Sequence, residues 1–104
     1  KNMEKSLIQQ QDIIFALKTL PQAHGIRKAS IFGSYAKGTA TSESDVDLLV
    51  EFDVTEIPDL IDFIGLKQGL QEYLHVTVDL VTPGSLSKYM KNEILLSAKT
   101  IYVK

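Results

Sequence analysis

The sequence predicts an α/β fold in which a small mixed β-sheet of about four strands is flanked by helices. Two observations predict it. Segments with helical periodicity alternate with short apolar, β-branched segments, and this alternation favours a mostly parallel or mixed sheet covered by helices. The length of 104 residues and the hydrophobic content of 44% are those of one domain, so residues 1–104 are expected to share one core.

The chain is expected to begin with a helix from about Glu4 to Leu20. This segment contains no Gly or Pro, and apolar residues recur in it at helical spacing, namely Ile13, Ile14, Leu17 and Leu20. Pro21 and Gly25 mark its end. Lys28 to Phe32 is short and partly apolar, and it stops at Gly33, which predicts a strand that runs into a tight turn.

A brief helix and an acidic strand are expected next. Ser34 is expected to cap a helix over Tyr35 to Lys37, which Gly38 ends. After a polar loop, Asp45 to Phe52 predicts a strand with two different faces. One face carries Val46, Leu48, Val50 and Phe52, and the other carries Asp45, Asp47, Leu49 and Glu51. The apolar run within this segment indicates a central strand.

The second half of the chain is expected to continue as helix, strand, helix and strand. Pro58 suits the first turn of a helix to about Leu74, in which apolar residues repeat at threes and fours, namely Leu60, Phe63, Leu66, Leu70 and Tyr73. A strand over Val76 to Val81 is expected next, broken by Pro83-Gly84. Ser85 to about Ser97 is expected to be helical, in two pieces capped at Ser85 and Asn92, and Thr100 to Val103 is the last expected strand.

Composition argues against several classes of function. The formal net charge of −2 is too small and of the wrong sign for a broad nucleic-acid-binding surface. The absence of cysteine excludes disulfides, thiol nucleophiles and thiolate metal sites. Without a long apolar run or a secretory leader, a cytoplasmic protein with no membrane association is expected. A chain this short buries a modest fraction of its surface, so a partner subunit is expected to stabilise it.

Asp45 and Asp47 form the first candidate site. Two apart on a strand, their side chains project from one face with Cα atoms about 6 to 7 Å apart. Carboxylates this close repel each other unless a cation or water lies between them, so the pair predicts a Mg²⁺ or Mn²⁺ site, with a solvated acidic face as the alternative. Asp79, between Val78 and Leu80, would join the pair if its strand is the neighbour. Otherwise it would pair with a lysine or arginine, or lie at an exposed strand end.

Gly33 and Ser34 form the second candidate site. A turn without a Cβ lets backbone amides approach a ligand closely, and a helix N-terminus favours phosphate. Ser34 adds a hydroxyl donor, and Lys37 can supply a point charge. The phosphate loops GxxxxGK[ST] and GxGxxG are absent, as is the GxSxG of hydrolases. The alternative is an ordinary turn at the end of a strand.

These two motifs together resemble a known signature. Gly33-Ser34, ten intervening residues and Asp45-Val46-Asp47 are similar to the DNA polymerase β-like nucleotidyltransferase superfamily. FGSYAKG followed by SDVDLLV most resembles its minimal nucleotidyltransferase branch, which consists of stand-alone domains of about this length. The resemblance runs from Ile31 to the last strand. It implies the nucleotidyltransferase fold over the single domain.

The resemblance also implies roles for particular residues. By position, Gly33 and Ser34 would hold the triphosphate of a nucleotide, and Lys37 stands where the branch commonly has Arg or Lys. The catalytic residues and metal ligands implied for two Mg²⁺ ions, with Mn²⁺ as a substitute, are Asp45, Asp47 and Asp79.

Members of this branch typically act as antitoxins paired with a HEPN-domain protein, often a ribonuclease toxin encoded beside them. Some transfer AMP from ATP to a tyrosine of that partner. The resemblance therefore implies a metal-dependent protein adenylyltransferase that uses ATP and assembles with a HEPN toxin. Two alternatives stay open: a non-catalytic antitoxin that occludes its toxin, and a nucleotidyltransferase that acts on a small molecule, for which no acceptor domain is visible.

Other polar and aromatic residues have simpler expected roles. His24 and His75 lie near element ends and are expected at the surface. Glu51 shares a face with the acidic pair but lies farther along the strand, so it is expected to be solvated or paired with a cation. Tyr35 could stack on a base or pack the short helix.

Overall fold

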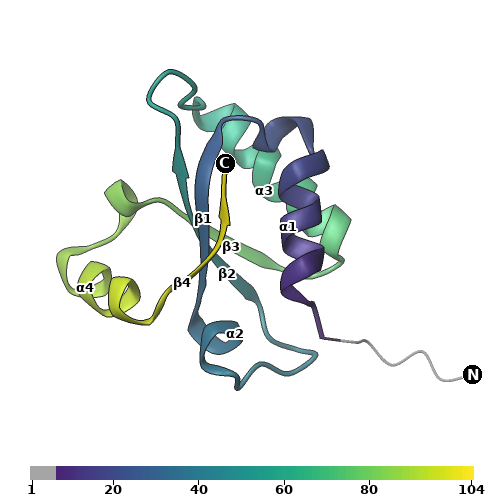
Figure 1. Ribbon diagram of the computed structural model, residues 1–104, viewed down its shortest axis with the longest axis vertical. Helices are drawn as coiled ribbons and strands as arrows, with labels where there is room; N and C mark the ends of the chain where they lie inside the picture. The colour runs from purple at the N-terminus through teal and green to yellow at the C-terminus, as the bar shows by residue number, and fades with distance from the viewer. Residues whose placement is uncertain (1–6) are drawn as a thin grey trace, which may run out of the picture.

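The computed structural model describes residues 7–104, in which a four-stranded sheet carries helices on both faces (Figure 1). The helices are α1 (Gln10–Thr19), α2 (Gly33–Lys37), α3 (Leu60–Leu74) and α4 (Lys88–Ser97), with 3-10 turns at Pro21–Ala23 and Pro83–Ser85. The strands are β1 (Ile26–Phe32), β2 (Val46–Phe52), β3 (Val78–Val81) and β4 (Lys99–Val103). In this part of the chain, no helix is long and apolar enough to span a bilayer.

The sheet is mixed, as predicted, with the strand order β3-β2-β1-β4. β1 pairs antiparallel with both β2 and β4, whereas β2 and β3 are parallel. The parallel pair requires a crossover connection, which α3 supplies. β2 lies between two strands, so the prediction of a central strand is confirmed, and β3 is an edge strand.

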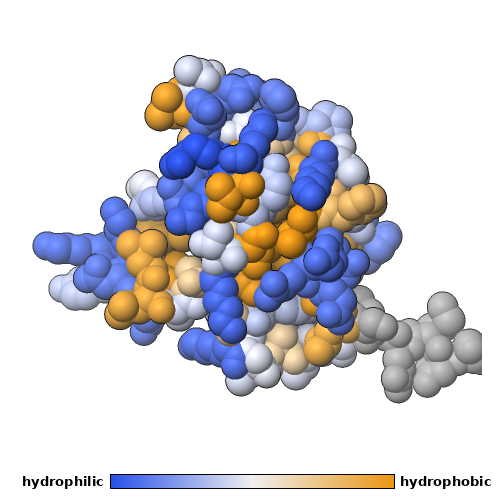
Figure 2. Space-filling view, in the orientation of Figure 1, coloured by the Kyte–Doolittle hydropathy of each residue, from blue (hydrophilic) through white to orange (hydrophobic). Residues whose placement is uncertain are grey.

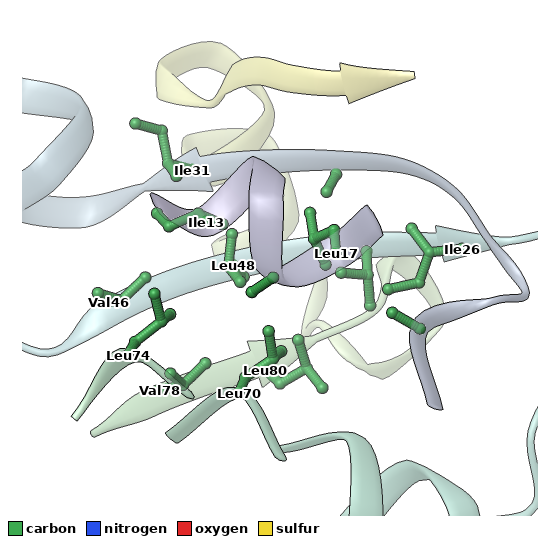
Figure 3. Close-up of a cluster of buried hydrophobic side chains, with 14 of the residues drawn as sticks. Ile13, Leu17, Ile26, Ile31, Val46, Leu48, Leu70, Leu74, Val78 and Leu80 are labelled. Carbon is green, nitrogen blue, oxygen red and sulfur yellow. The ribbon is translucent and has the colours of Figure 1, made fainter. Parts of the chain in front are cut away.

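The main core lies between the sheet and the helices α1 and α3 (Figure 3). Alternate residues of β2 point into it, and the predicted apolar face of this strand is confirmed by the burial of Val46, Leu48 and Val50. The largest fully buried side chains are Ile13, Ile26, Ile31, Leu48, Leu66, Leu70, Val46, Val50 and Val78. Burial of each such side chain contributes about 1.5–3 kcal/mol before conformational entropy is counted.

The second face of the sheet carries a smaller apolar cluster under α4. Its buried members are Phe32, Leu49 and Ile94, which come from β1, β2 and α4 respectively. Figure 1 shows α4 on the opposite side of the sheet from α1 and α3. This is also the face to which Asp47 and Asp79 belong, because residues two apart on a strand share a face.

The capping side chains, rather than the apolar periodicity, set where the helices begin. The first helix starts at Gln10, not near Glu4, because the backbone N–H of Gln9 donates to the Asp12 carboxylate at 2.9 Å. Residues 4–6 of the predicted helix lie outside the described residues. Asp59 caps α3 by accepting a hydrogen bond from the N–H of Asp62 at 2.8 Å. The prediction of Pro58 within the first turn is therefore wrong.

The three further cap predictions, at Ser34, Ser85 and Asn92, are also wrong. The hydroxyl of Ser87 accepts from the N–H of Met90 and caps α4, so neither Ser85 nor Asn92 has this role. The N-cap of α2 is Phe32, and Ser34 lies inside the helix. The positions of both N-caps depend on local backbone geometry, which the spacing of apolar residues does not predict.

Part of the predicted stripe of α3 does not reach the core. Leu66, Leu70 and Leu74 are buried, but Leu60 is 73% exposed and Tyr73 is also exposed. Leu60 belongs to an exposed apolar surface at the start of the helix, which we call the α3 patch, formed by Ile57, Leu60, Ile61 and Ile64.

Candidate active site

Two of the three predicted carboxylates are direct neighbours at one end of the sheet. In the parallel pairing of β2 with β3, Val46 lies opposite Val78 and Asp47 lies opposite Asp79. Asp45 immediately precedes β2 and is exposed. The prediction that the strand of Asp79 neighbours the acidic strand is confirmed. Asp79 is exposed to solvent, because β3 is an edge strand of the sheet.

The antiparallel strand β1 brings Gly33 against the same carboxylate. Phe32, the last residue of β1, pairs with Asp47, so the chain turns into α2 beside this side chain. Gly33 has φ of 69°, a conformation that favours glycine. A Cβ built at Gly33 would collide with Oδ2 of Asp47. The backbone conformation therefore favours glycine, and any larger residue would also have to displace the Asp47 carboxylate.

The first turn of α2 presents its backbone amides near the acidic pair. Its N-cap residue Phe32 makes no side-chain capping hydrogen bond, so no side chain satisfies these donors in the described residues. Ser34 is half-buried one residue into the helix, and Lys37 is exposed in its last turn. Gly38 ends α2 in the left-handed conformation, as predicted. This arrangement leaves donors free for an anion.

The charged form of the Asp47 carboxyl group is disfavoured at this site. Burial, followed by the negative charges of Asp79 and Asp45, raises the pKa of Asp47 from 3.8 to about 6. Oxygen donors under such repulsion fit a hard divalent cation. Within residues 7–104, no three His, Cys, Asp or Glu side chains stand as an assembled metal cage. Asp45, Asp47 and Asp79 would thus have to draw together around a bound ion.

The raised pKa of Asp47 predicts a stability that falls as pH rises from about 4 to about 6. In this window the folded protein holds a proton that the unfolded chain releases, so rising pH favours unfolding. We expect the free energy of unfolding to fall by about 1–2 kcal/mol, after a discount for solvent screening. Denaturant titrations of wild type and Asp47→Asn at several pH values measure the difference. Equal pH dependence in both proteins would contradict it.

This comparison isolates one carboxyl group among several. Hydrogen bonds from the backbone and side chain of Thr55 lower the pKa of Asp53, which gives the opposite pH dependence. The Asp53 contribution is present in both proteins and cancels in the difference. Any difference between the two proteins in how the free energy of unfolding changes with pH is then due to the loss of the ionisable Asp47 side chain.

The remaining polar and aromatic residues take the simpler roles. Glu51 lies 3.5 Å from Arg27, so its prediction as paired with a cation is confirmed. Tyr35 is half-buried and packs against the main core, which favours the packing interpretation over base stacking. His24 and His75 are exposed, as predicted. Sequence reasoning missed the contact between Gly33 and Asp47, for which the sequence alone holds no signal.

A mixed sheet of this order, with a glycine turn against strand carboxylates, places the protein in the class of α/β nucleotidyltransferases. The family described as nucleotidyltransferase domain matches residues 13–101, and the chain belongs to that family. This confirms the predicted nucleotidyltransferase fold, and the relatives that follow confirm the predicted resemblance to the minimal nucleotidyltransferase branch.

The chain is similar to a protein adenylyltransferase and to two solved toxin-antitoxin structures. The protein adenylyltransferase MntA of Thermococcus cleftensis is 41% identical over 86 residues, which cover 83% of each chain. A crystal structure of a toxin-antitoxin with AMP-PNP matches at a TM-score of 0.73 and 28% identity, covering 93% of this chain and 75% of that one. A third match is the structure of a tri-AMPylated Shewanella oneidensis HEPN toxin in complex with an MNT antitoxin. Its TM-score is 0.64 at 25% identity, and the match covers 91% of this chain and 70% of that one.

Proposed function

We propose that this nucleotidyltransferase is a metal-dependent protein adenylyltransferase that transfers AMP from ATP to a tyrosine of a HEPN toxin and so acts as its antitoxin. One observation carries the proposal: Asp47 and Asp79 face each other across β2 and β3, and Gly33 lies directly against Asp47. The amides proposed to hold phosphate and the carboxylates proposed as metal ligands thus lie side by side, which supports the proposal. The names of the similar proteins support a protein as acceptor.

The reaction exchanges one phosphate linkage for another. The acceptor hydroxyl attacks the α-phosphorus of ATP, the bond from this phosphorus to the bridging oxygen breaks, and pyrophosphate leaves. Two Mg²⁺ ions bound at Asp45, Asp47 and Asp79 would lower the pKa of the attacking hydroxyl and neutralise the triphosphate. The other residues of the proposed site position the triphosphate of ATP for this attack.

Each side chain has a distinct part in this proposal. The amides at Gly33 and the hydroxyl of Ser34 hold the triphosphate, and the ammonium of Lys37 adds positive charge beside it. Asp47 is fixed between Gly33 and the neighbouring strand. Asp79 is exposed at the sheet edge, where the hydroxyl of a protein acceptor can reach it and pass on its proton.

Replacing Asp79 with asparagine is expected to separate activity from stability. The change empties one metal-ligand position, so AMP transfer should fall at least about 100-fold, while the loss of one clustered negative charge leaves the fold at least as stable. The assay incubates the protein with α-labelled ATP, Mg²⁺ and a purified HEPN protein as the proposed acceptor, and thermal unfolding is measured in parallel.

Asp62→Asn is the matched control, because Asp62 is an exposed carboxylate on α3 outside the site. It should transfer AMP at the wild-type rate. A fully active Asp79→Asn protein would refute the assigned site. If wild type inhibits the HEPN protein tightly but leaves no label on it, neutralisation occurs by occlusion instead.

A further inference from the structure

Helix α4 exposes an unusual amount of apolar surface. Only Ile94 of this helix is buried, whereas four large apolar side chains face solvent, Tyr89, Met90, Leu95 and Leu96, which we call the α4 patch. Tyr89 and Leu96 are each 89% exposed, and they lie seven residues apart, which places them on one stripe of the helix. Figure 2 shows the resulting hydrophobic surface over α4, at the lower left of the molecule.

The α4 patch borders the active site on the same face of the sheet. Ile94 packs against Leu49, which lies two residues beyond Asp47, and against Phe32, which pairs with Asp47. α4 also contacts α2, the helix that begins at Gly33. A protein whose hydroxyl reaches the carboxylates from this face therefore passes over or beside α4.

The other elements around the carboxylates offer little apolar contact area. In residues 33–45, which form α2 and the following loop, no large hydrophobic side chain is exposed, and the exposed groups include Lys37 and Glu43. A specific protein interface buries about 800 Å² on each partner, with an apolar centre. A single acceptor tyrosine at the carboxylates buries much less area than this. A specific complex with the acceptor protein therefore needs an apolar surface next to the active site.

We infer that the α4 patch is the docking surface for the protein acceptor of AMP transfer, an inference that rests on the proposed function. Lys88 and Lys91 flank the patch and form no ion pair with any residue from 7 to 104. The complementary partner surface is therefore apolar, with acidic side chains at its rim. A second copy of this chain offers no such match in α4 itself, whose charged residues are Lys88, Lys91 and Glu93.

The test compares Leu96→Glu with Ile61→Glu. Both positions are apolar, strongly exposed and helical, but Ile61 belongs to the α3 patch, beside Phe52 at the far end of β2 from Asp47. Both variants should fold, and thermal unfolding checks this. Affinity for the purified HEPN protein is measured by calorimetry, and the KM values for HEPN protein and ATP are measured with labelled ATP.

Leu96→Glu should weaken HEPN binding about 30-fold or more and raise the KM for HEPN protein, with the KM for ATP unchanged within about twofold. Tyr89→Ala should act in the same direction, and Ile61→Glu should stay within about threefold of wild type. Wild-type behaviour of Leu96→Glu, or an equal loss in Ile61→Glu, would overturn the inference.

Two further outcomes separate this inference from the proposed function. If wild type binds the HEPN protein without labelling it, and Leu96→Glu loses that binding, then docking is supported and adenylylation is refuted. If sedimentation shows a wild-type dimer that Leu96→Glu dissociates while HEPN binding persists, the α4 patch belongs to a second copy and the inference is overturned.

Discussion

Asp47→Asn is expected to abolish AMP transfer, with the initial rate falling at least about 1000-fold, which corresponds to about 4 kcal/mol in transition-state free energy. Asp47 links two parts of the site, since it pairs with Asp79 and lies against Gly33. The same change should raise the free energy of unfolding at pH 7 by about 1–2 kcal/mol, because a partly buried, repelled charge is removed. Labelled-ATP assays and denaturant titrations measure the two effects.

The opposite signs of these effects make this prediction specific. A residue with only a structural role would lose stability and activity together. Asp62→Asn again serves as the control and should change neither. An Asp47→Asn protein that is less stable than wild type at pH 7, or that retains transfer, would contradict the account of the site.

Gly33→Ala is expected to disrupt the site much more than Gly38→Ala does. Both glycines have positive φ, 69° and 78°, so alanine costs about 1–2 kcal/mol of strain at either position. Only at Gly33 does the added Cβ meet Oδ2 of Asp47, whereas nothing lies within 4 Å at Gly38. We expect Gly33→Ala to lose about 1–3 kcal/mol more in unfolding free energy and to transfer AMP about 100-fold more slowly. Gly38→Ala should keep its transfer rate within about threefold.

A double-mutant cycle tests whether the contact is the cause. In an Asp47→Ala background the carboxylate that Gly33→Ala displaces is absent, so the extra cost in unfolding free energy should disappear. Thermal and denaturant unfolding of the four proteins give the coupling energy. If Gly33→Ala costs the same stability in both backgrounds, backbone strain alone explains its effect.

The sequence predicted the features that follow from short-range periodicity. Alternation along residues 46–52 correctly separated the core face of β2 from the acidic face, since successive side chains of a strand point to opposite sides. The apolar run also correctly indicated a central strand. The four-strand mixed sheet followed from the order of the elements.

The features that sequence reasoning missed depend on tertiary geometry. The flanking residues Val78 and Leu80 did not decide whether Asp79 is buried or exposed, and the structure exposes it because an edge strand buries only its other face here. The contact of Gly33 with Asp47 depends on the antiparallel register of β1 and β2, which turn chemistry alone does not set. Helix starts were misplaced because single capping hydrogen bonds decided them.

The most direct test of the central claim is the intact mass of the HEPN protein after incubation with this chain, ATP and Mg²⁺. The account predicts that wild type adds whole AMP groups to the HEPN protein and that Asp47→Asn adds none. A HEPN protein that stays unmodified with wild type, or that Asp47→Asn modifies equally well, would contradict it.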